Sequence, residues 1–357
     1  MKKKILIVGD YMWDWYQSAC GQEISRLGLD VEEFRTFDFF WRWEENKPEP
    51  TIKSLFHKIQ YVFLKGPILY NLNNELLKKV LNTRPDYIWF YNSTQIFSST
   101  LDKIRKYLPK IILIQYSNDN PFRKNGKNAI WKLFKKNIKK HDIHFAYRYS
   151  NIDDYKRLGC KATYILKPYF IPAVDFPKDN VSKKHNSEVV FAGHYENDGR
   201  LEALELILKN NIDLKLFGGG WNNVLKKLPS SSLLKKQYPV YPAIGTNYQN
   251  VICGSKIALC FLSKLNQDSY TRRNFQIPAM KVTVLSEYSY ELSQMFEENK
   301  EIVFFKNHNE LIKKIKLLLK KEILNKNISE AGYKRVYNDK HDIHNRMRVF
   351  VNTLLKY

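Results

Sequence analysis

Short apolar runs of β-type residues alternate with stretches of helical periodicity along most of the chain. Between the runs, apolar side chains recur every three or four residues, as they do over Thr100–Leu108. Strands separated by helices predict an α/β protein with two Rossmann-like, doubly wound parallel sheets. The predicted strands are Lys4–Val8, Val31–Phe37, Asp86–Tyr91, Lys110–Tyr116, Ile143–Tyr147 and Ala162–Leu166, then Glu188–Gly193, Leu214–Phe217, Ile257–Phe261, Val282–Leu285 and Glu301–Phe305.

A segment rich in proline and charge separates the two sets of strands. Pro168, Pro172 and Pro177 precede a polar stretch at 178–187 that shows no periodicity. Such a composition is typical of a linker. We therefore predict a first domain over residues 1–170, a linker over 171–187 and a second domain over 188–340.

The chain has 357 residues and a formal net charge of +23, from 59 Lys and Arg against 36 Asp and Glu. Apolar residues make up 44%, which excludes a disordered chain, and no apolar run is long enough to span a membrane as a helix. The charge fits either an anionic partner or a bias toward Lys, Asn, Ile and Tyr that carries no function. Four cysteines without a C-x-x-C pair favour free thiols in a reducing cytoplasm.

The common phosphate-binding motifs do not occur in the sequence. No G-x-G-x-x-G follows the first strand, and there is no G-x-x-x-x-G-K-[ST], which disfavours NAD-type and P-loop chemistry. The triple glycine Gly218–Gly220 follows a predicted strand and fits either a close approach of backbone to a nucleotide or a tight turn.

Two adjacent arginines open a predicted helix in the second half. Arg272 and Arg273 lie in a polar stretch before the helical run, which leads into a strand. The amides at a helix N-terminus and the guanidinium fork both suit phosphate oxygens. The alternative is a pair of solvated surface side chains.

Motifs over Val251–Phe350 resemble those of the spore-maturation-type (CgeB-like) glycosyltransferases, which have GT-B architecture. Upstream, the strand end at Phe191–Gly193 with Arg200, and Leu216–Trp221, resemble the family's F-x-G and G-x-G-W patterns. The matching segments of the second half are Ser255–Phe261, Arg273–Ala279, Leu285–Glu287, Phe296–Phe305, Glu310–Ile315, Ile328–Gly332 and His341–Arg346.

The resemblance implies two Rossmann-like domains facing across a cleft, the first binding the acceptor and the second binding a nucleotide sugar. It also implies that a last helix within 341–357 crosses back to the first domain. The donor is expected to be a UDP-sugar, and the acceptor a saccharide, glycolipid or glycoprotein. The expected donor-binding residues are Gly193, His194, Arg200, Gly218, Gly219, Trp221, Tyr241, Tyr248, Thr271, Arg272, Arg273, Asn274 and Gln276.

One position departs from the family pattern. Where the resemblance expects a Glu that holds the donor ribose, this chain has Gln276, and the position of the paired Glu is held by Asp268. An amide still hydrogen-bonds a hydroxyl, but it carries no charge. Donor binding therefore stays the expectation, and the stereochemistry of transfer is left open.

Sugar transfer requires stabilisation of the leaving phosphate, and inversion also requires a base. Arg200, Arg272 and Arg273 are expected to supply the first without a metal ion, since no convincing D-x-D loop occurs. Asp119, after the strand ending at Tyr116, is the first candidate base, and Asp10 or Asp14, after the first strand, are the other candidates. An Asx turn before Pro121 is the alternative for Asp119.

The stretch Arg123–His141 carries eight Lys or Arg residues and no acid. Ile130, Trp131, Leu133, Phe134 and Ile138 give it an apolar face of helical spacing. It is either a helix that contacts anionic lipid or a surface helix whose apolar face packs on the core. A peripheral membrane contact is therefore one expectation.

Two further functions stay open from the sequence. A nucleic-acid-binding protein would use the positive charge, although no known nucleic-acid-binding motif occurs and the basic residues are dispersed. A GT-B protein that binds sugars without turnover is suggested by Gln276. An active, metal-independent glycosyltransferase in the cytoplasm, without a nucleic-acid partner, is the preferred hypothesis.

Overall fold

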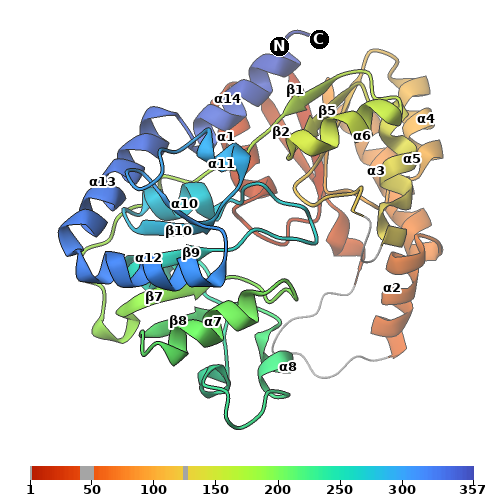
Figure 1. The fold of residues 1–357 in the computed structure, drawn as a ribbon. Helices are drawn as coiled ribbons and strands as arrows, with labels where there is room; N and C mark the ends of the chain where they lie inside the picture. Colours follow the sequence, from red (N-terminus) through yellow and green to blue (C-terminus); the bar gives the residue numbers. More distant parts are fainter. Residues whose placement is uncertain (1, 41–51, 124–127) are drawn as a thin grey trace. The chain divides into compact units, whose positions relative to one another are not determined.

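The computed structural model describes residues 2–40, 52–123 and 128–357 (Figure 1). The chain forms two compact units. Unit 1 comprises Met1–Lys167 and His344–Tyr357, and unit 2 comprises Pro168–Ile343. Unit 2 is thus inserted into unit 1, and the chain crosses from one unit to the other twice.

Unit 1 contains a parallel six-stranded sheet in the order β2-β1-β3-β4-β5-β6. Each predicted run of the first half overlaps one of these strands, because parallel strands covered on both faces are largely apolar. The strands are β1 (Lys4–Gly9), β2 (Asp30–Arg35), β3 (Tyr87–Tyr91), β4 (Ile112–Ser117), β5 (Ile143–Ala146) and β6 (Thr163–Ile165).

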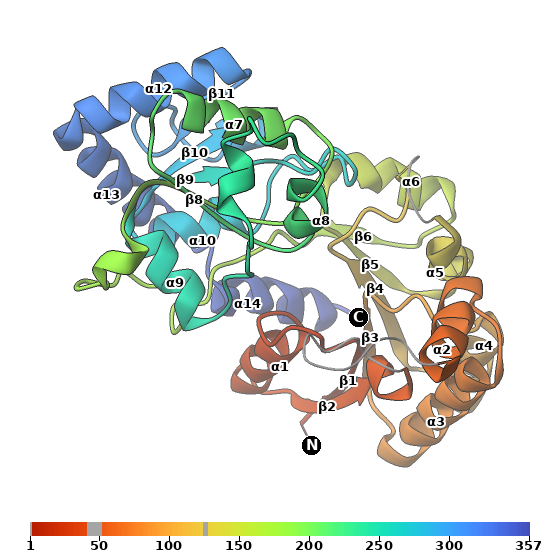
Figure 2. The same ribbon diagram turned by 90° about the horizontal axis from the view of Figure 1, so that it is seen from below.

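Helices cover both faces of this sheet (Figure 2). Leu6 and Val8 pack on one face with the core-facing side chains of α3 and α4. On the other, the last helix α14 (Ile343–Leu354) places Phe350 against Trp89, with ring centroids 4.3 Å apart. The remaining helices are α1 (Gln17–Arg26), α2 (Ile52–Phe63), α3 (Pro67–Thr83), α4 (Ser98–Tyr107), α5 (Lys132–Asn137) and α6 (Ile152–Arg157).

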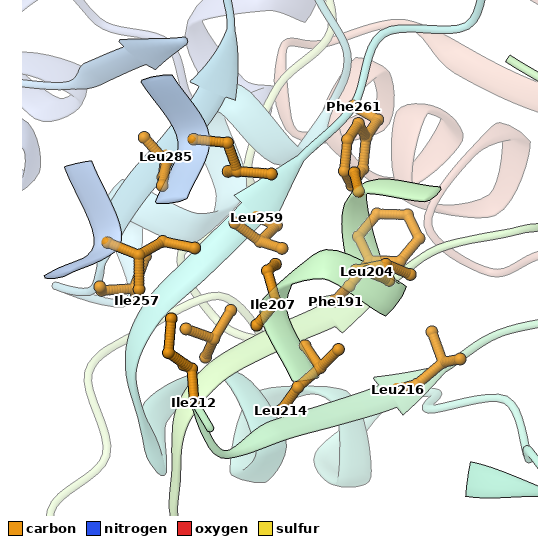
Figure 3. Packing of buried hydrophobic residues seen from close by; sticks show 14 of the residues in the cluster. Phe191, Leu204, Ile207, Ile212, Leu214, Leu216, Ile257, Leu259, Phe261 and Leu285 are labelled. Atoms are coloured by element: carbon orange, nitrogen blue, oxygen red, sulfur yellow. The ribbon is translucent and has the colours of Figure 1, made fainter. Parts of the chain in front are cut away.

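Unit 2 contains a parallel five-stranded sheet in the order β11-β10-β9-β7-β8. Its core is built from strand residues such as Phe191, Leu216 and Leu259 and from Leu204 and Ile207 of α7 (Figure 3). Its elements are β7 (Ser187–Ala192), α7 (Arg200–Lys209), β8 (Leu214–Phe217), α8 (Trp221–Leu225), α9 (Thr246–Cys253), β9 (Ser255–Cys260), α10 (Arg273–Ala279), β10 (Thr283–Glu287), α11 (Tyr290–Ser293), β11 (Val303–Phe305), α12 (His308–Lys320) and α13 (Glu322–Asn338).

The segment predicted as a linker at 171–187 is packed into unit 2. Asp175 is 1% exposed, and its carboxylate accepts a hydrogen bond from the amide of Ile171 at 2.8 Å. Next to it, Phe170 forms a parallel bridge with Asp342. The two ends of unit 2 therefore lie side by side, and proline-rich sequence here forms fixed structure rather than a free connection.

Candidate functional site

The loops that follow β7 and β8 at the carboxyl edge of unit 2 are packed tightly against each other. A Cβ atom on Gly218, whose φ is +137°, would lie 2.0 Å from the carbonyl oxygen of Gly193. A Cβ on Gly219 would lie 2.7 Å from Nδ1 of His194, whose side chain is exposed. The glycines are therefore explained by contact between two loops, and they leave His194 at the surface of this edge.

Two aromatic residues predicted to bind the donor have different positions. Trp221 is fully buried, and its Nε1–H donates to the carbonyl oxygen of Gly193 at 2.8 Å. Tyr241 is 67% exposed, and its carbonyl oxygen accepts from the amide of Gly218 at 3.1 Å. Trp221 thus anchors the loop after β7 from within the core, whereas the Tyr241 ring is accessible to solvent.

Arg200 is buried and ion-paired rather than open to a ligand. Its Nε and Nη2 donate to the two carboxylate oxygens of Asp198 at 2.7 and 2.6 Å. Its Nη1 donates to the carbonyl oxygen of His194 at 2.5 Å. The side chains of Arg200 and Asp198 are 2% and 4% exposed. Instead of facing a phosphate as predicted, the Arg200 side chain fixes the loop from His194 to Arg200 through these hydrogen bonds.

The start of α10 does not present a row of free amides. The amide of Thr271 donates to Oδ1 of Asn274 at 2.8 Å, and Asn274 donates to Oγ of Ser286 at 3.0 Å. Asn274 is fully buried. The amides of Asn274 and Phe275 donate to the carbonyl oxygens of Thr271 and Arg272 at 3.1 and 3.0 Å, so backbone hydrogen bonds occupy the start of the helix. Thr271 and Asn274 shape the turn that carries the arginines.

Arg272 and Gln276 share one buried acid, Asp175. Nη2 of Arg272 donates to Oδ2 of Asp175 at 3.0 Å, and Nε2 of Gln276 donates to Oδ1 at 2.6 Å. A Glu at 276 would place two carboxylates against each other, so the departure from the family pattern has a local cause. Local sequence did not point to Asp175, because its partners lie 97 and 101 residues away. The unexpected amide at position 276 was the one available signal.

Arg273 approaches Gly193 at the carboxyl edge of unit 2, and its charge acts on the Tyr248 hydroxyl. Nη1 of Arg273 lies 3.4 Å from the Cβ position of Gly193. Tyr248, in the first turn of α9, has a buried hydroxyl oxygen for which the described residues offer no hydrogen-bond partner. Burial raises the pKa of this hydroxyl, while the Arg273 guanidinium acts in the opposite direction. The hydroxyl is therefore protonated at neutral pH and can donate beside a cation.

The loop after β4 in unit 1 holds Asp119 between two anchored amides. Asn118 exchanges hydrogen bonds with Asn92, and its carbonyl oxygen accepts from Nη2 of Arg148 at 2.9 Å. Asn120 is fully buried, and its Oδ1 accepts from the amide of Phe122 at 2.9 Å. The Asx turn weighed for this loop therefore forms at Asn120, and the half-buried Asp119 lies between fixed neighbours.

Asp14 and Asp10 occupy the loop after β1. Asp14 is exposed, and Oδ1 of Asp10 accepts from the amide of Met12 at 3.0 Å. Burial raises the pKa of Tyr61, and the charges of Asp10 and Asp119 add to the rise. Asp10 and Asp119 thus act on one hydroxyl, and Asp14 has no such relation to Asp119 in this structure.

The basic stretch at 123–141 buries its apolar side chains. Trp131, Phe134 and Ile138 are each no more than 3% exposed and form a core cluster of unit 1. Residues 124–127 of the stretch lie outside the described residues. The alternative of a surface helix that packs on the core is the one observed, so this apolar face is not available to a lipid surface.

Over residues 2–40, 52–123 and 128–357, no three His, Cys, Asp or Glu side chains are grouped to hold a metal ion. In the same ranges no helix is long and apolar enough to cross a bilayer.

Comparison with known proteins places this geometry in context. Residues 200–352 match the family model described as Glycosyl transferase-like. No curated protein matches the chain. Among solved structures, sucrose-phosphate synthase from Thermosynechococcus elongatus matches with a TM-score of 0.69 and 10% identity, over 99% of this chain and 100% of that one.

Two further structures were obtained with a nucleotide or nucleotide sugar. HepE from Anabaena, in complex with UDP-glucose, matches with a TM-score of 0.67 and 12% identity, over 99% of this chain and 100% of that one. MnaA from S. aureus, with UDP, gives 0.57 and 15%, over 99% and 96%. The predicted GT-B fold is confirmed. The match to the Glycosyl transferase-like family model lies in the second half of the chain.

Proposed function

We propose that this GT-B protein, with its glycosyl transferase-like domain, moves a sugar from a UDP-activated donor to a hydroxyl of a saccharide, glycolipid or glycoprotein. Unit 2 would bind the donor and unit 1 the acceptor. The same proposal includes membership of the CgeB-like subfamily and independence of a metal ion. It also includes a cytoplasmic location, at the inner face of the membrane where the acceptor is lipid-linked. The structures of HepE and MnaA with UDP-glucose or UDP support the choice of nucleotide.

The observation that carries the proposal is the buried Tyr248 hydroxyl beside Arg273. A buried hydroxyl without a partner costs free energy, so a protein retains one most readily where a ligand completes its hydrogen bond. With a guanidinium next to it, the arrangement offers one cation and one neutral donor. That pair suits an anionic oxygen, such as one on a diphosphate.

In the proposed reaction the bond between the anomeric carbon and the phosphate oxygen breaks, and a bond to the acceptor oxygen forms. The leaving phosphate gains negative charge, which Arg273 and Tyr248 would stabilise more strongly than in the ground state. If transfer inverts the anomeric carbon, Asp119 would take the proton of the acceptor hydroxyl. If it retains the configuration, Asp119 would orient the acceptor.

Gln276, Arg272 and Asp175 support this site from behind. With its amide nitrogen committed to Asp175, Gln276 has only its oxygen left to accept from a hydroxyl of the donor. The carbonyl oxygen of Tyr169 and the carboxylate of Asp175 hold the Arg272 guanidinium, at 3.2 and 3.0 Å. Arg272 is therefore proposed to position the turn, and Arg273 to contact phosphate.

The test is thermal stabilisation by UDP and UDP-sugars, compared with GDP-, CMP- and dTDP-sugars. At 100 times its dissociation constant, a ligand adds about 2.7 kcal/mol to stability. Arg273→Ala should abolish most of that shift, while Arg335→Ala, which removes an arginine that pairs with Asp339, should not. Tyr248→Phe should weaken UDP binding by about tenfold without lowering the stability of the free protein.

Three results would count against the proposal. UDP binding unchanged in folded Arg273→Ala would remove the phosphate contact. Saturable UDP binding without transfer or hydrolysis across a panel of donors would indicate a sugar-binding relic. Tight oligonucleotide binding with a steep salt dependence, and no UDP binding, would favour the nucleic-acid alternative.

A further inference from the structure

One helix of unit 1 presents a row of large apolar side chains to solvent. On α2, Leu55, Phe56, Ile59 and Phe63 are 55%, 50%, 46% and 73% exposed. Single exposed apolar residues are common on monomeric proteins, but four on about two turns of one helix form a contiguous patch. We call these four residues the α2 patch.

The opposite face of α2 is fixed to the unit, so the α2 patch cannot turn inward. Gln60 is 3% exposed, and its Oε1 accepts from the amide of Ile68 at 2.9 Å, which ties α2 to α3. The Tyr61 ring packs against the rings of Phe40 and Phe37, with centroids 5.4 and 5.9 Å apart. The apolar character of α2 thus exceeds what the core of unit 1 uses.

Exposed lysines lie on and next to α2. Lys58 and Lys65 are both exposed, and residues 55–74 contain no acid. In addition, α2 contacts the segment Asn128–Trp131 of the basic stretch, on the same side of the sheet as α5 (Figure 2). That stretch buries its apolar face and turns Lys132, Lys136 and Lys139 to solvent. From the sequence, one helix within 123–141 was expected to expose both an apolar face and lysines. In the structure the exposed lysines lie on that stretch, and the exposed apolar residues lie on the neighbouring α2.

We propose that the α2 patch and these lysines together form a docking surface for an anionic lipid bilayer. The apolar side chains would enter the boundary between headgroups and acyl chains, and the lysines would contact lipid phosphates. A second copy of the chain is the less suitable occupant, since a symmetric pairing on this face would bring the same lysines together. This inference rests on the membrane location in the proposed function and names the surface that would carry it, whereas sugar transfer is tested separately by UDP binding.

The experiment is co-sedimentation of the full chain with phosphatidylcholine vesicles, with and without phosphatidylglycerol. Binding should require the anionic lipid. Phe56→Ser with Phe63→Ser should weaken the partition coefficient by at least about tenfold, since two exposed phenyl rings are lost. Lys132→Gln with Lys136→Gln and Lys139→Gln should weaken it by about 100-fold at low salt.

Matched controls on unit 2 separate this surface from general charge and hydrophobicity. Lys313→Gln, Lys316→Gln and Lys320→Gln remove the same charge from the exposed face of α12. Leu317→Ser with Ile323→Ser removes side chains that are 42% and 79% exposed. Both controls should bind vesicles as the wild type does, and circular dichroism should show all variants folded.

Other outcomes overturn the proposal. Equal binding to neutral and anionic vesicles, or equal losses in test and control variants, would show that the α2 patch is not the lipid contact. A concentration-dependent dimer that the phenylalanine substitutions abolish, with no vesicle binding, would assign the surface to a second copy.

Discussion

The carboxyl edges of the two sheets differ in the candidate ligand-binding groups that they carry on the same architecture. In unit 1 this edge has the acids Asp10 and Asp119 and a group of asparagines. In unit 2 it has Arg273 and the Tyr248 hydroxyl, and the nearby acids Asp175 and Asp198 are committed to internal partners. A parallel α/β sheet therefore fixes where a ligand binds, and the loops decide whether that ligand is a hydroxyl or an anion.

The two edges are also held differently. In unit 1, side-chain amides fasten the loops, as in the pair of Asn92 and Asn118. In unit 2 the loops are fastened by backbone contact between Gly193 and Gly218 and by the bidentate ion pair of Arg200 with Asp198. Loss of a fastening is expected to be costly in unit 2, where it exposes buried charge, and mild in unit 1.

The largest effect is expected from Arg200→Met. Removing one partner of a buried ion pair leaves Asp198 uncompensated, at a cost of about 3–5 kcal/mol in unfolding free energy. Chemical denaturation monitors the loss, and adding Asp198→Asn to the variant should recover part of it. Intact stability together with lost UDP binding would instead make Arg200 a donor ligand.

Acid should act on unit 1 through the buried pair His141 and His144. Burial lowers the pKa of His141 from 6.5 to about 4, and it also lowers that of His144. Below pH 6.5 the unfolded chain binds protons that the folded chain refuses, so stability falls between pH 6.5 and 4, by about 3 kcal/mol for His141 alone.

Denaturation curves across this pH range check the acid effect. Neither ring nitrogen of His144 has a hydrogen-bond partner among the described residues, so His144→Phe should be tolerated and should flatten the pH dependence. An unchanged pH dependence in that variant would contradict the assignment.

An intermediate effect is expected from Gln276→Glu. The substitution replaces a 2.6 Å hydrogen bond to Asp175 by two facing carboxylates, at a cost of about 2 kcal/mol. Asp175→Asn in the same chain should restore stability, because it returns one charge and one amide to the pair. If the double variant also keeps UDP affinity, position 276 needs an acceptor oxygen and no particular charge. Failure of the rescue would show that Arg272 requires the charge of Asp175.

The smallest effect is expected from Asn92→Gly. Asn92 has a φ of +52°, which glycine adopts without strain, so the change removes mainly its hydrogen bonds to Asn118, at about 1 kcal/mol. Looser placement of Asp119 should lower kcat several-fold and leave the donor KM unchanged. Asn211→Gly, with a φ of +58° in unit 2, is the control and should leave both constants unchanged. A raised donor KM in Asn92→Gly would tie this loop to donor binding.

Local pattern was sufficient to locate the strands, because parallel strands covered on both faces are largely apolar. It was not sufficient for contacts between distant segments. The composition of residues 171–187 predicted a linker, but one acid in it, Asp175, forms hydrogen bonds with residues about 100 positions later. Burial of that acid depends on the fold and leaves no local trace.

At the candidate site, the motifs predicted which residues lie close together better than they predicted what each residue does. Gly193, Gly218 and Arg273 do meet at one edge, as the motifs suggested. Arg200 and Trp221 lie behind it, since Asp198 and the carbonyl oxygen of Gly193 satisfy them internally. The roles of Asp119 and Asp14 stay predictions. The basic stretch at 123–141 has both the charge and the apolar face that the sequence indicated, but its apolar face is buried. The exposed apolar residues belong to the neighbouring helix α2.

The adjacent ends of unit 2 have a consequence for how this chain can be taken apart. The amide of Phe170 donates to the carbonyl oxygen of His341, and the amide of Ile343 donates to that of Phe170, at 3.2 and 2.9 Å. Residues 168–343 can therefore be excised, transplanted or circularly permuted as one cassette with a short splice. Trimming the final fourteen residues, by contrast, would uncover Trp89, so the damage would fall on the half of the protein that was synthesised first.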